Sequence, residues 1–192
     1  MIYLASQSPR RRELLSQLQV TFDVIDVDVH EQRQPGEKPW AYVNRTAREK
    51  AGKGLLQMAG NPGALVLGAD TDVVLADAVL GKPDGAEQAF AMLRALSGRS
   101  HDVITAVWLM SAGREAHHVV SSRVRFADIS DAEINAYIAT GEPFGKAGAY
   151  AVQGRAAAFI ASIEGSYSGI MGLPLHETYQ LLKQFNVPFR AD

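Results

Sequence analysis

The sequence predicts an α/β protein with a mixed, twisted sheet flanked by helices, in which two lobes surround a central cleft. Short β-rich runs alternate with helical patterns along the chain, and such alternation is typical of α/β folds. With 192 residues, 47% of them hydrophobic, the chain is long enough to bury a core of its own. No repeat, low-complexity tract or linker interrupts it, so we predict one domain over residues 1–192.

The composition argues against several classes of protein. The 19 Lys and Arg residues balance 21 Asp and Glu, so the chain lacks the basic surplus of duplex-binding proteins. The absence of Cys excludes disulfide frameworks, thiolate zinc sites and cysteine nucleophiles, and it suits a reducing compartment. No apolar run approaches the ~18 residues of a membrane span, and no secretion signal is visible. We therefore expect a cytoplasmic protein that binds neither nucleic acid nor membrane.

Hydrophobic spacing and start signals define the elements of the first half. Ile2–Ala5 is typical of a short buried strand, and Ser8 and Pro9 fit the cap and the first position of a helix. The following elements are expected to be a β-rich segment over Val20–Val29, a polar turn over Gln34–Pro39, a helix over Trp40–Met58 whose buried stripe begins at Trp40, a strand over Ala64–Leu67 that ends at Gly68-Ala69-Asp70, and a small hairpin of Val73–Leu75 with Val79–Leu80.

Capping signals define the helices of the second half. Asp84–Glu87 and Ser130–Glu133 each fit a capping box, and Gly98 and Gly141 fit the ends of the two helices that follow. The other expected elements are two long strands over Asp102–Met110 and Val119–Phe126 joined by a turn at Ser111–Arg114, a strand over Ala157–Ile163, a glycine-rich loop over Gly165–Gly172, and a last helix opened by Pro174.

The segment Ser6–Arg11 has the chemistry of an anion site. A strand that leads into a helix presents unpaired N–H groups at the positive end of the helix dipole. Arg10 and Arg11 add forked donors suited to phosphate. The alternative interpretation is a solvated basic face on an ordinary helix.

Two carboxylates lie close together after the predicted strand Ala64–Leu67. Asp70 follows this strand at the carboxyl edge, where open α/β sheets place their ligands, and Asp72 lies two positions later. Such a pair could hold a divalent cation or position a water molecule. The alternative is a polar turn between strands.

Four further side chains could have either a functional role or an ordinary structural one. Lys50 lies at the edge of a helix stripe, where local chemistry favours an ammonium that reaches the surface over one that enters a cleft. Lys82 lies in a loop before the next helix, and Glu31 is either a metal ligand or an exposed acid. Gln153 offers one donor and one acceptor, which match the N3–H and O4 edge of uracil or thymine, or it is a polar loop residue.

Several short motifs follow one another along nearly the whole chain. They are Ser6-Gln7-Ser8-Pro9-Arg10-Arg11, Glu31-Gln32-Arg33, Arg48-Glu49-Lys50-Ala51, Gly68-Ala69-Asp70-Thr71, Gly81-Lys82-Pro83, Leu96-Ser97-Gly98 with His101 and Thr105-Ala106, Lys146-Ala147-Gly148-Ala149-Tyr150 with Gln153-Gly154, and Gly165-Ser166-Tyr167 with Gly172-Leu173-Pro174-Leu175. No single motif is decisive, but the set in this order resembles the Maf family of nucleoside triphosphate pyrophosphatases.

The resemblance implies a reaction and a set of residues. The family splits the α–β phosphoanhydride of a nucleotide into a monophosphate and pyrophosphate with a divalent cation, Mg²⁺ or Mn²⁺. By the motifs, Asp70 would be the general base, and Glu31 and Asp70 would lie near the metal. The residues that hold the phosphates would be Ser6, Arg11, Lys50 and Lys82. The expected partner is therefore a nucleoside triphosphate substrate. The oligomeric state is left open, and a homodimer is one of the states that the sequence allows.

The resemblance also separates branches of the family. Arg10, Thr71 and Gln153 resemble the dTTP/UTP branch, whereas the branch that acts on 7-methyl-GTP has Trp in place of Arg10 and Glu in place of Gln153. Two alternatives remain: the same reaction on 7-methyl-GTP, or a nucleotide-binding regulator of cell division and septum formation. Gly145 stands where the family often has Asp, and His30 where an acidic or polar residue is usual.

Overall fold

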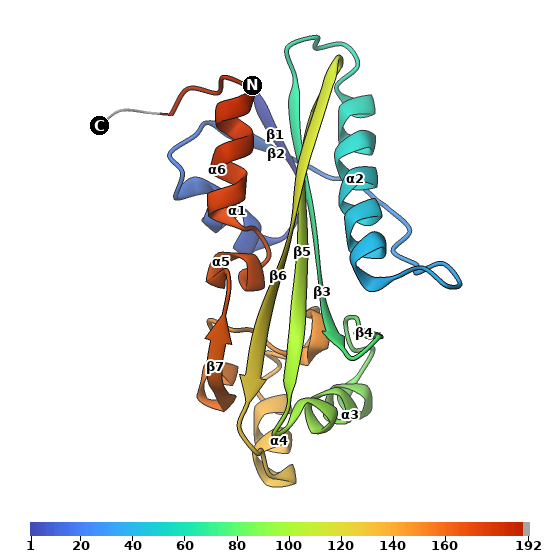
Figure 1. Ribbon diagram of the computed structural model, residues 1–192, viewed down its shortest axis with the longest axis vertical. Coiled ribbons are helices and arrows are strands. Elements are labelled where there is room, and N and C mark those ends of the chain that lie inside the picture. Colours follow the sequence, from blue (N-terminus) through green and yellow to red (C-terminus); the bar gives the residue numbers. More distant parts are fainter. Residues whose placement is uncertain (190–192) are drawn as a thin grey trace. The chain divides into compact units, whose positions relative to one another are not determined.

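A computed structural model describes residues 1–189 of the chain (Figure 1). Its strands are β1 (Ile2–Ala5), β2 (Phe22–Ile25), β3 (Leu65–Leu75), β4 (Ala78–Leu80), β5 (Ser100–Ser111), β6 (Arg114–Phe126) and β7 (Ile160–Glu164). Its helices are α1 (Pro9–Ser16), α2 (Pro39–Gln57), α3 (Ala86–Leu96), α4 (Asp131–Ile138), α5 (Tyr167–Met171) and α6 (Leu175–Gln184), with short 3₁₀ turns η1 (Ala147–Ala149) and η2 (Arg155–Phe159). Residues 190–192, which end the predicted domain, lie outside the described part.

The strands form one mixed sheet. Their order in this 7-stranded sheet is β2-β1-β3-β5-β6-β7, with β4 paired to β3. β1 runs parallel to β2 and β3, whereas β4 on β3 and β7 on β6 are antiparallel. This confirms the predicted α/β class with a mixed sheet and flanking helices. Among the helices of the described residues, none is both long and apolar enough to cross a membrane.

The tertiary contacts divide the chain into two compact units. Unit 1 comprises residues 1–70, residues 105–120 and the C-terminal segment from Gly172, and unit 2 comprises residues 71–104 and 121–171. The long strands β3, β5 and β6 each contribute to both units. Unit 1 holds most of the N-terminal motifs, and unit 2 holds those around Lys82 and Gln153.

Helix α2 approaches the sheet of unit 1 very closely. A Cβ atom on Gly68 would lie 2.5 Å from the backbone nitrogen of Ala51 and 2.6 Å from the carbonyl oxygen of Ala47. A Cβ atom on Gly54 would lie 2.8 Å from the side chain of Val66. Because both glycines lack that atom, the backbones of α2 and β3 come almost into contact. Figure 1 shows α1 and α6 on the other side of β1 and β3.

Unit 2 has an aromatic and aliphatic core around a buried histidine. Its members include Val73, Leu93, Leu96, Val124, Ile134, Tyr137 and Val152. The ring of His101 packs edge-on against Phe126 and Tyr150, and its Nε2 lies 2.9 Å from the Tyr150 hydroxyl. Its Nδ1 has no hydrogen-bond partner among residues 1–189. Burial lowers the pKa of His101 to about 4.

This pKa predicts an acid-sensitive core. Because His101 has a pKa of about 4 in the folded protein and 6.5 ordinarily, the unfolded chain binds more protons between these values. Its stabilising contribution is therefore complete above pH 6.5 and is lost as the pH falls toward 4. We expect urea denaturation at pH 4.5 to show an extra loss of about 2–3 kcal/mol relative to pH 7, which His101→Gln abolishes. An equal loss in both proteins would contradict the assignment.

Local signals located several element ends correctly. The capping box of α4 is present, with the Ser130 side chain accepting from the Glu133 amide. Gly98 and Gly141 follow α3 and α4 with φ of +68° and +76°, as expected for residues that end helices. Buried Val124 and Phe126 alternate with exposed residues at the end of β6, as is typical of a strand with one face on the core.

Other boundaries were wrong. The predicted box at Asp84 does not form, because Gly85 is the cap of α3 and the side chain of Gln88 accepts from the Asp84 amide instead. Trp40 is 58% exposed rather than buried, because Pro39, the first residue of α2, takes the buried position of the first turn. The further corrections are that Val20–Val29 contains only β2, that Ala157–Ile163 begins as η2 before β7, and that Gly165–Gly172 contains α5. The predicted starts of α1 and α6 are confirmed, since Ser8 and Pro174 are their cap residues, although neither makes a side-chain cap bond.

Candidate functional site

A buried lysine between two carboxylates forms the centre of the candidate site in unit 1. The Nζ atom of Lys50 lies 2.6 Å from Asp70 Oδ1 and 2.6 Å from Glu31 Oε1. Lys50 and Asp70 are only 8% and 6% exposed, whereas the Glu31 side chain is 35% exposed. The interpretation of Lys50 as a surface-reaching lysine is therefore wrong: its ammonium is enclosed because two anions compensate for its burial.

The glycine contact between α2 and β3 explains this placement. Gly68 and Asp70 are two residues apart on β3, so their positions face the same side of the sheet. Gly68 faces Ala51 on α2, and Lys50 is the neighbouring residue of that helix. Asp70 therefore meets Lys50 over the same face. We predicted that the strand would end at Asp70, but β3 continues to Leu75, because a charged residue can stay inside a buried strand when it is paired.

The start of α1 lies beside this part of β3. Leu4 of β1 pairs with Leu67, so the chain beyond Ala5 leaves the sheet next to residues 68–70. The Ser6 hydroxyl oxygen accepts from the Ser8 amide at 3.2 Å and from Nη1 of Arg11 at 3.3 Å.

Nε of Arg11 also donates to the Gly172 carbonyl at 2.8 Å. The predicted anion-binding residues Ser6 and Arg11 are thus in direct contact, and a residue more than one hundred positions away fixes the guanidinium.

The charge at the start of α1 favours an anion there. The first turn of α1 has no acidic residue and carries Arg10 and Arg11, although the positive end of the helix dipole disfavours cations. Arg10 is half-buried, and this burial lowers the pKa of its guanidinium. An anionic ligand would offset both costs, which argues for the binding interpretation over a plain basic face.

The other predicted residues belong to unit 2. Thr71 is half-buried in β3, directly after Asp70. Lys82 is exposed in the loop after β4, and Gln153 is exposed between η1 and η2. Asp72 is buried within β3, so the polar-turn interpretation of Asp70 and Asp72 does not hold.

Glu142 organises the loop that carries Gln153. Its carboxylate accepts from the Tyr137 hydroxyl at 2.9 Å and from the Arg155 amide at 3.1 Å. A Cβ atom on Gly154 would collide with this carboxylate where it now lies, so the glycine leaves room for the Glu142 side chain. The sequence analysis did not single out Glu142. The one sequence feature that marks it is its place directly after Gly141, the glycine that follows α4.

Comparison with known proteins identifies the family. A model described as Maf-like protein matches residues 1–185. The chain belongs to the Maf family.

Two relatives of this Maf chain cover almost its whole length. A protein of Xanthomonas euvesicatoria pv. vesicatoria (strain 85-10) named dTTP/UTP pyrophosphatase is 57% identical over 187 residues, which are 96% of this chain and 98% of that protein. A nucleoside triphosphate pyrophosphatase of Xylella fastidiosa (strain 9a5c) is 52% identical over 186 residues, with the same shares of 96% and 98%. Among solved structures, the Staphylococcus aureus Ham1 protein has a TM-score of 0.49 and 12% identity, over 96% of this chain and 97% of that one.

The carboxylates of the candidate site are suited to a divalent cation only if it arrives with a ligand. Residues 1–189 contain no group of three or more His, Asp or Glu side chains that could hold a metal. Glu31 and Asp70 nevertheless converge on Lys50, which contacts one oxygen of each. Mg²⁺ is commonly bound by one or two carboxylates together with substrate phosphates and water. Two carboxylates beside a basic helix start suit that arrangement and do not suit a site built from protein ligands alone.

Proposed function

We propose that this chain hydrolyses the α–β phosphoanhydride of nucleoside triphosphates to a monophosphate and pyrophosphate, with dTTP and UTP as preferred substrates. The observation that carries the proposal is the buried Lys50 between Asp70 and Glu31, beside a helix start that bears two arginines. A relative with 57% identity that is named dTTP/UTP pyrophosphatase supports the choice of substrates.

Asp70 is the proposed general base. The ammonium of Lys50 donates to the Asp70 carboxylate and fixes its orientation. The carboxylate can then accept the proton of a water molecule that attacks the α-phosphorus. The attack breaks the bond to the bridging oxygen, and the electron pair leaves with pyrophosphate. The negative charge that moves onto this leaving group needs preorganised cations.

The remaining unit 1 residues supply these cations and the metal ligands. We assign Lys50, Arg10 and Arg11 to the phosphates, together with the hydroxyl of Ser6. The family resemblance gives Lys82, a residue of unit 2, the same role. Glu31 and Asp70 would hold Mg²⁺ or Mn²⁺, which when bound neutralises phosphate charge as a Lewis acid. The contribution of unit 1 itself is to place donors and a base where they can meet a polyphosphate.

Gln153 and Thr71 are the proposed base-selecting residues. We expect Gln153→Glu to lower kcat/KM for UTP and dTTP by about 10-fold or more, since a carboxylate cannot donate to the O4 edge of a pyrimidine. The fall for purine triphosphates should be smaller. Steady-state kinetics on both substrate classes check this, and an equal loss on every nucleotide would make Gln153 a structural residue.

A nucleotide panel tests the proposed substrates. Pyrophosphate release should be fastest with dTTP and UTP, should need Mg²⁺ or Mn²⁺, and should stop when a chelator is added. Turnover of 7-methyl-GTP alone would keep the reaction and overturn the base preference. Nucleotide binding without any turnover would favour the regulator of septum formation instead.

A further inference from the structure

An irregular segment is held along α2 by side chains rather than by a sheet or helix. Residues 26–37, here named the strap, contain no strand or helix between β2 and α2. Four side chains of α2 hold the strap. From the start of the strap to its end, they are Gln57 at the carbonyl of Asp26, Lys53 at the carbonyl of Asp28, Lys50 at the carboxylate of Glu31, and Arg45 at the carbonyl of Gln32. The residue numbers thus rise along the strap while they fall along the helix. The strap therefore runs antiparallel to α2.

The spacing of these side chains places them on one face of the helix. Of these, residues 45, 53 and 57 are separated by multiples of four positions, and residues so spaced lie along one side of a helix surface. Lys50 adjoins this row and takes the one strap side chain, Glu31, that the proposed reaction uses. These contacts fix which strap residue lies beside which helix residue. A shift of the strap along the helix would move Glu31 away from Lys50.

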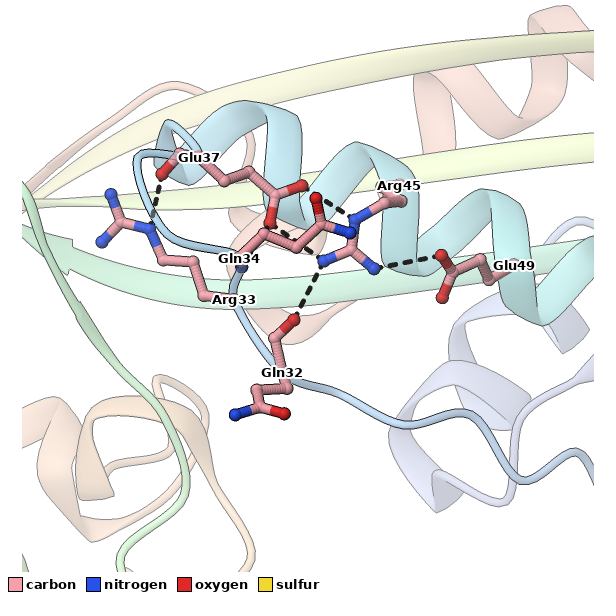
Figure 2. Close-up of polar contacts among 6 residues, drawn as sticks. All are labelled: Gln32, Arg33, Gln34, Glu37, Arg45 and Glu49. Carbon is pink, nitrogen blue, oxygen red and sulfur yellow. Dashed lines mark hydrogen bonds and ion pairs between the residues drawn. The ribbon is translucent and has the colours of Figure 1, made fainter.

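Arg45 makes the densest set of contacts with the strap (Figure 2). Its Nε and Nη2 atoms lie 2.8 Å and 2.9 Å from the two oxygens of Glu37, and Nη2 also donates to the Gln32 carbonyl at 3.0 Å. Its Nη1 reaches Glu49 at 3.0 Å. Arg33 donates back to the Glu37 carbonyl at 2.7 Å, which folds the strap upon itself.

This clamp is a charge-assisted contact between a guanidinium and a carboxylate. Side-chain hydrogen bonds from Arg45 lower the pKa of Glu37 to about 2. The Glu37 side chain is only 11% exposed, and a planar guanidinium on both oxygens of a carboxylate is a strong and directional contact.

We propose that Arg45 is a positioning residue that holds Glu31 against Lys50 by clamping the strap at Gln32 and Glu37. The inference rests on the proposed function, since it assigns Arg45 a part in the same site. Glu31 is next to Gln32 in the chain, its side chain is one-third exposed, and its segment has no sheet partner. The position of its carboxylate therefore depends on the clamp, and Arg45 acts through Glu31 rather than on the substrate.

A matched pair of substitutions tests this role. Arg45→Met removes the clamp, and Arg48→Met removes a similar forked pair, to Glu115 on β6 at 2.9 Å, from the same helix without touching the strap. We expect Arg45→Met to lower kcat for UTP by about 10–100-fold with KM changed less than about 3-fold, since misplaced groups cost rate more than binding. Arg48→Met should stay within about 2-fold of the unaltered protein.

A readout independent of turnover accompanies the kinetics. Amide hydrogen exchange over residues 26–37 should accelerate in Arg45→Met and not in Arg48→Met. Arg45→Lys keeps the charge but loses the fork, so it should give an intermediate kcat and serves if Arg45→Met folds poorly. Unchanged exchange of the strap in both Arg45 variants would overturn the proposal.

A double substitution separates action through Glu31 from a general effect. If Arg45 acts through Glu31, Arg45→Met added to Glu31→Gln should slow the reaction no further. A multiplicative loss, or an Arg45→Met protein as fast as Arg48→Met, would overturn the role of Arg45 while leaving the proposed function intact. Absence of turnover in the unaltered protein would instead refute the proposed function, and the exchange data would still test the clamp.

Discussion

Asp70→Asn is expected to lower kcat for UTP hydrolysis by about 10²–10⁴-fold, the usual contribution of a general base. Asparagine keeps the size of the side chain and a carbonyl oxygen for Lys50, but it cannot accept the proton of the attacking water. Steady-state kinetics with UTP measure the effect. A variant that turns over at the unaltered rate would remove Asp70 from the mechanism.

A folding control accompanies this substitution. Lys50 keeps its contact with Glu31 at 2.6 Å in the absence of the Asp70 charge, so the buried ammonium retains one anion. Thermal unfolding of Asp70→Asn should therefore remain cooperative. A broad or lost transition would assign the lower rate to unfolding, and the kinetics would then have to be repeated below the transition.

Lys50→Met is expected to cost both stability and activity. The substitution leaves Asp70, 6% exposed, without its cation, and removal of one partner from a buried pair costs about 3–5 kcal/mol. The same change removes a cation proposed to contact the phosphates, so kcat should fall by about 10²-fold or more. Urea denaturation and UTP kinetics measure the two effects separately.

An exposed lysine of the same helix provides the stability control. Lys53 is exposed on α2, so Lys53→Met should change the free energy of unfolding by less than about 1 kcal/mol. If Lys50→Met is as stable as Lys53→Met, the Lys50–Asp70 pair does not stabilise the fold as the geometry indicates.

Local patterns were enough to predict the class of fold and many of its elements. The spacing of apolar residues located the helices, and signals such as the Ser130 box and Gly98 located several of their ends. These features depend on residues within one or two turns of each other. The same reasoning failed at Asp70, because the residue that allows a carboxylate inside β3 is Lys50, twenty positions earlier.

The candidate site was predicted by residue type but not by arrangement. Motifs indicated Glu31, Lys50 and Asp70, yet no periodic pattern indicated that one ammonium joins them. The close contact at Gly68 depends on tertiary packing, and a strap without secondary structure has no periodicity to detect. Arg45 was missed for the same reason, since its partners lie in that strap.

The most direct test of the account is the identity of the products that the unaltered protein forms from UTP with Mg²⁺. Cleavage of the α–β phosphoanhydride predicts UMP and pyrophosphate in equal amounts, with neither formed when a chelator is present. UDP with orthophosphate would place the attack at the γ-phosphorus and contradict the assigned reaction, and no turnover of UTP or dTTP would contradict the assigned function.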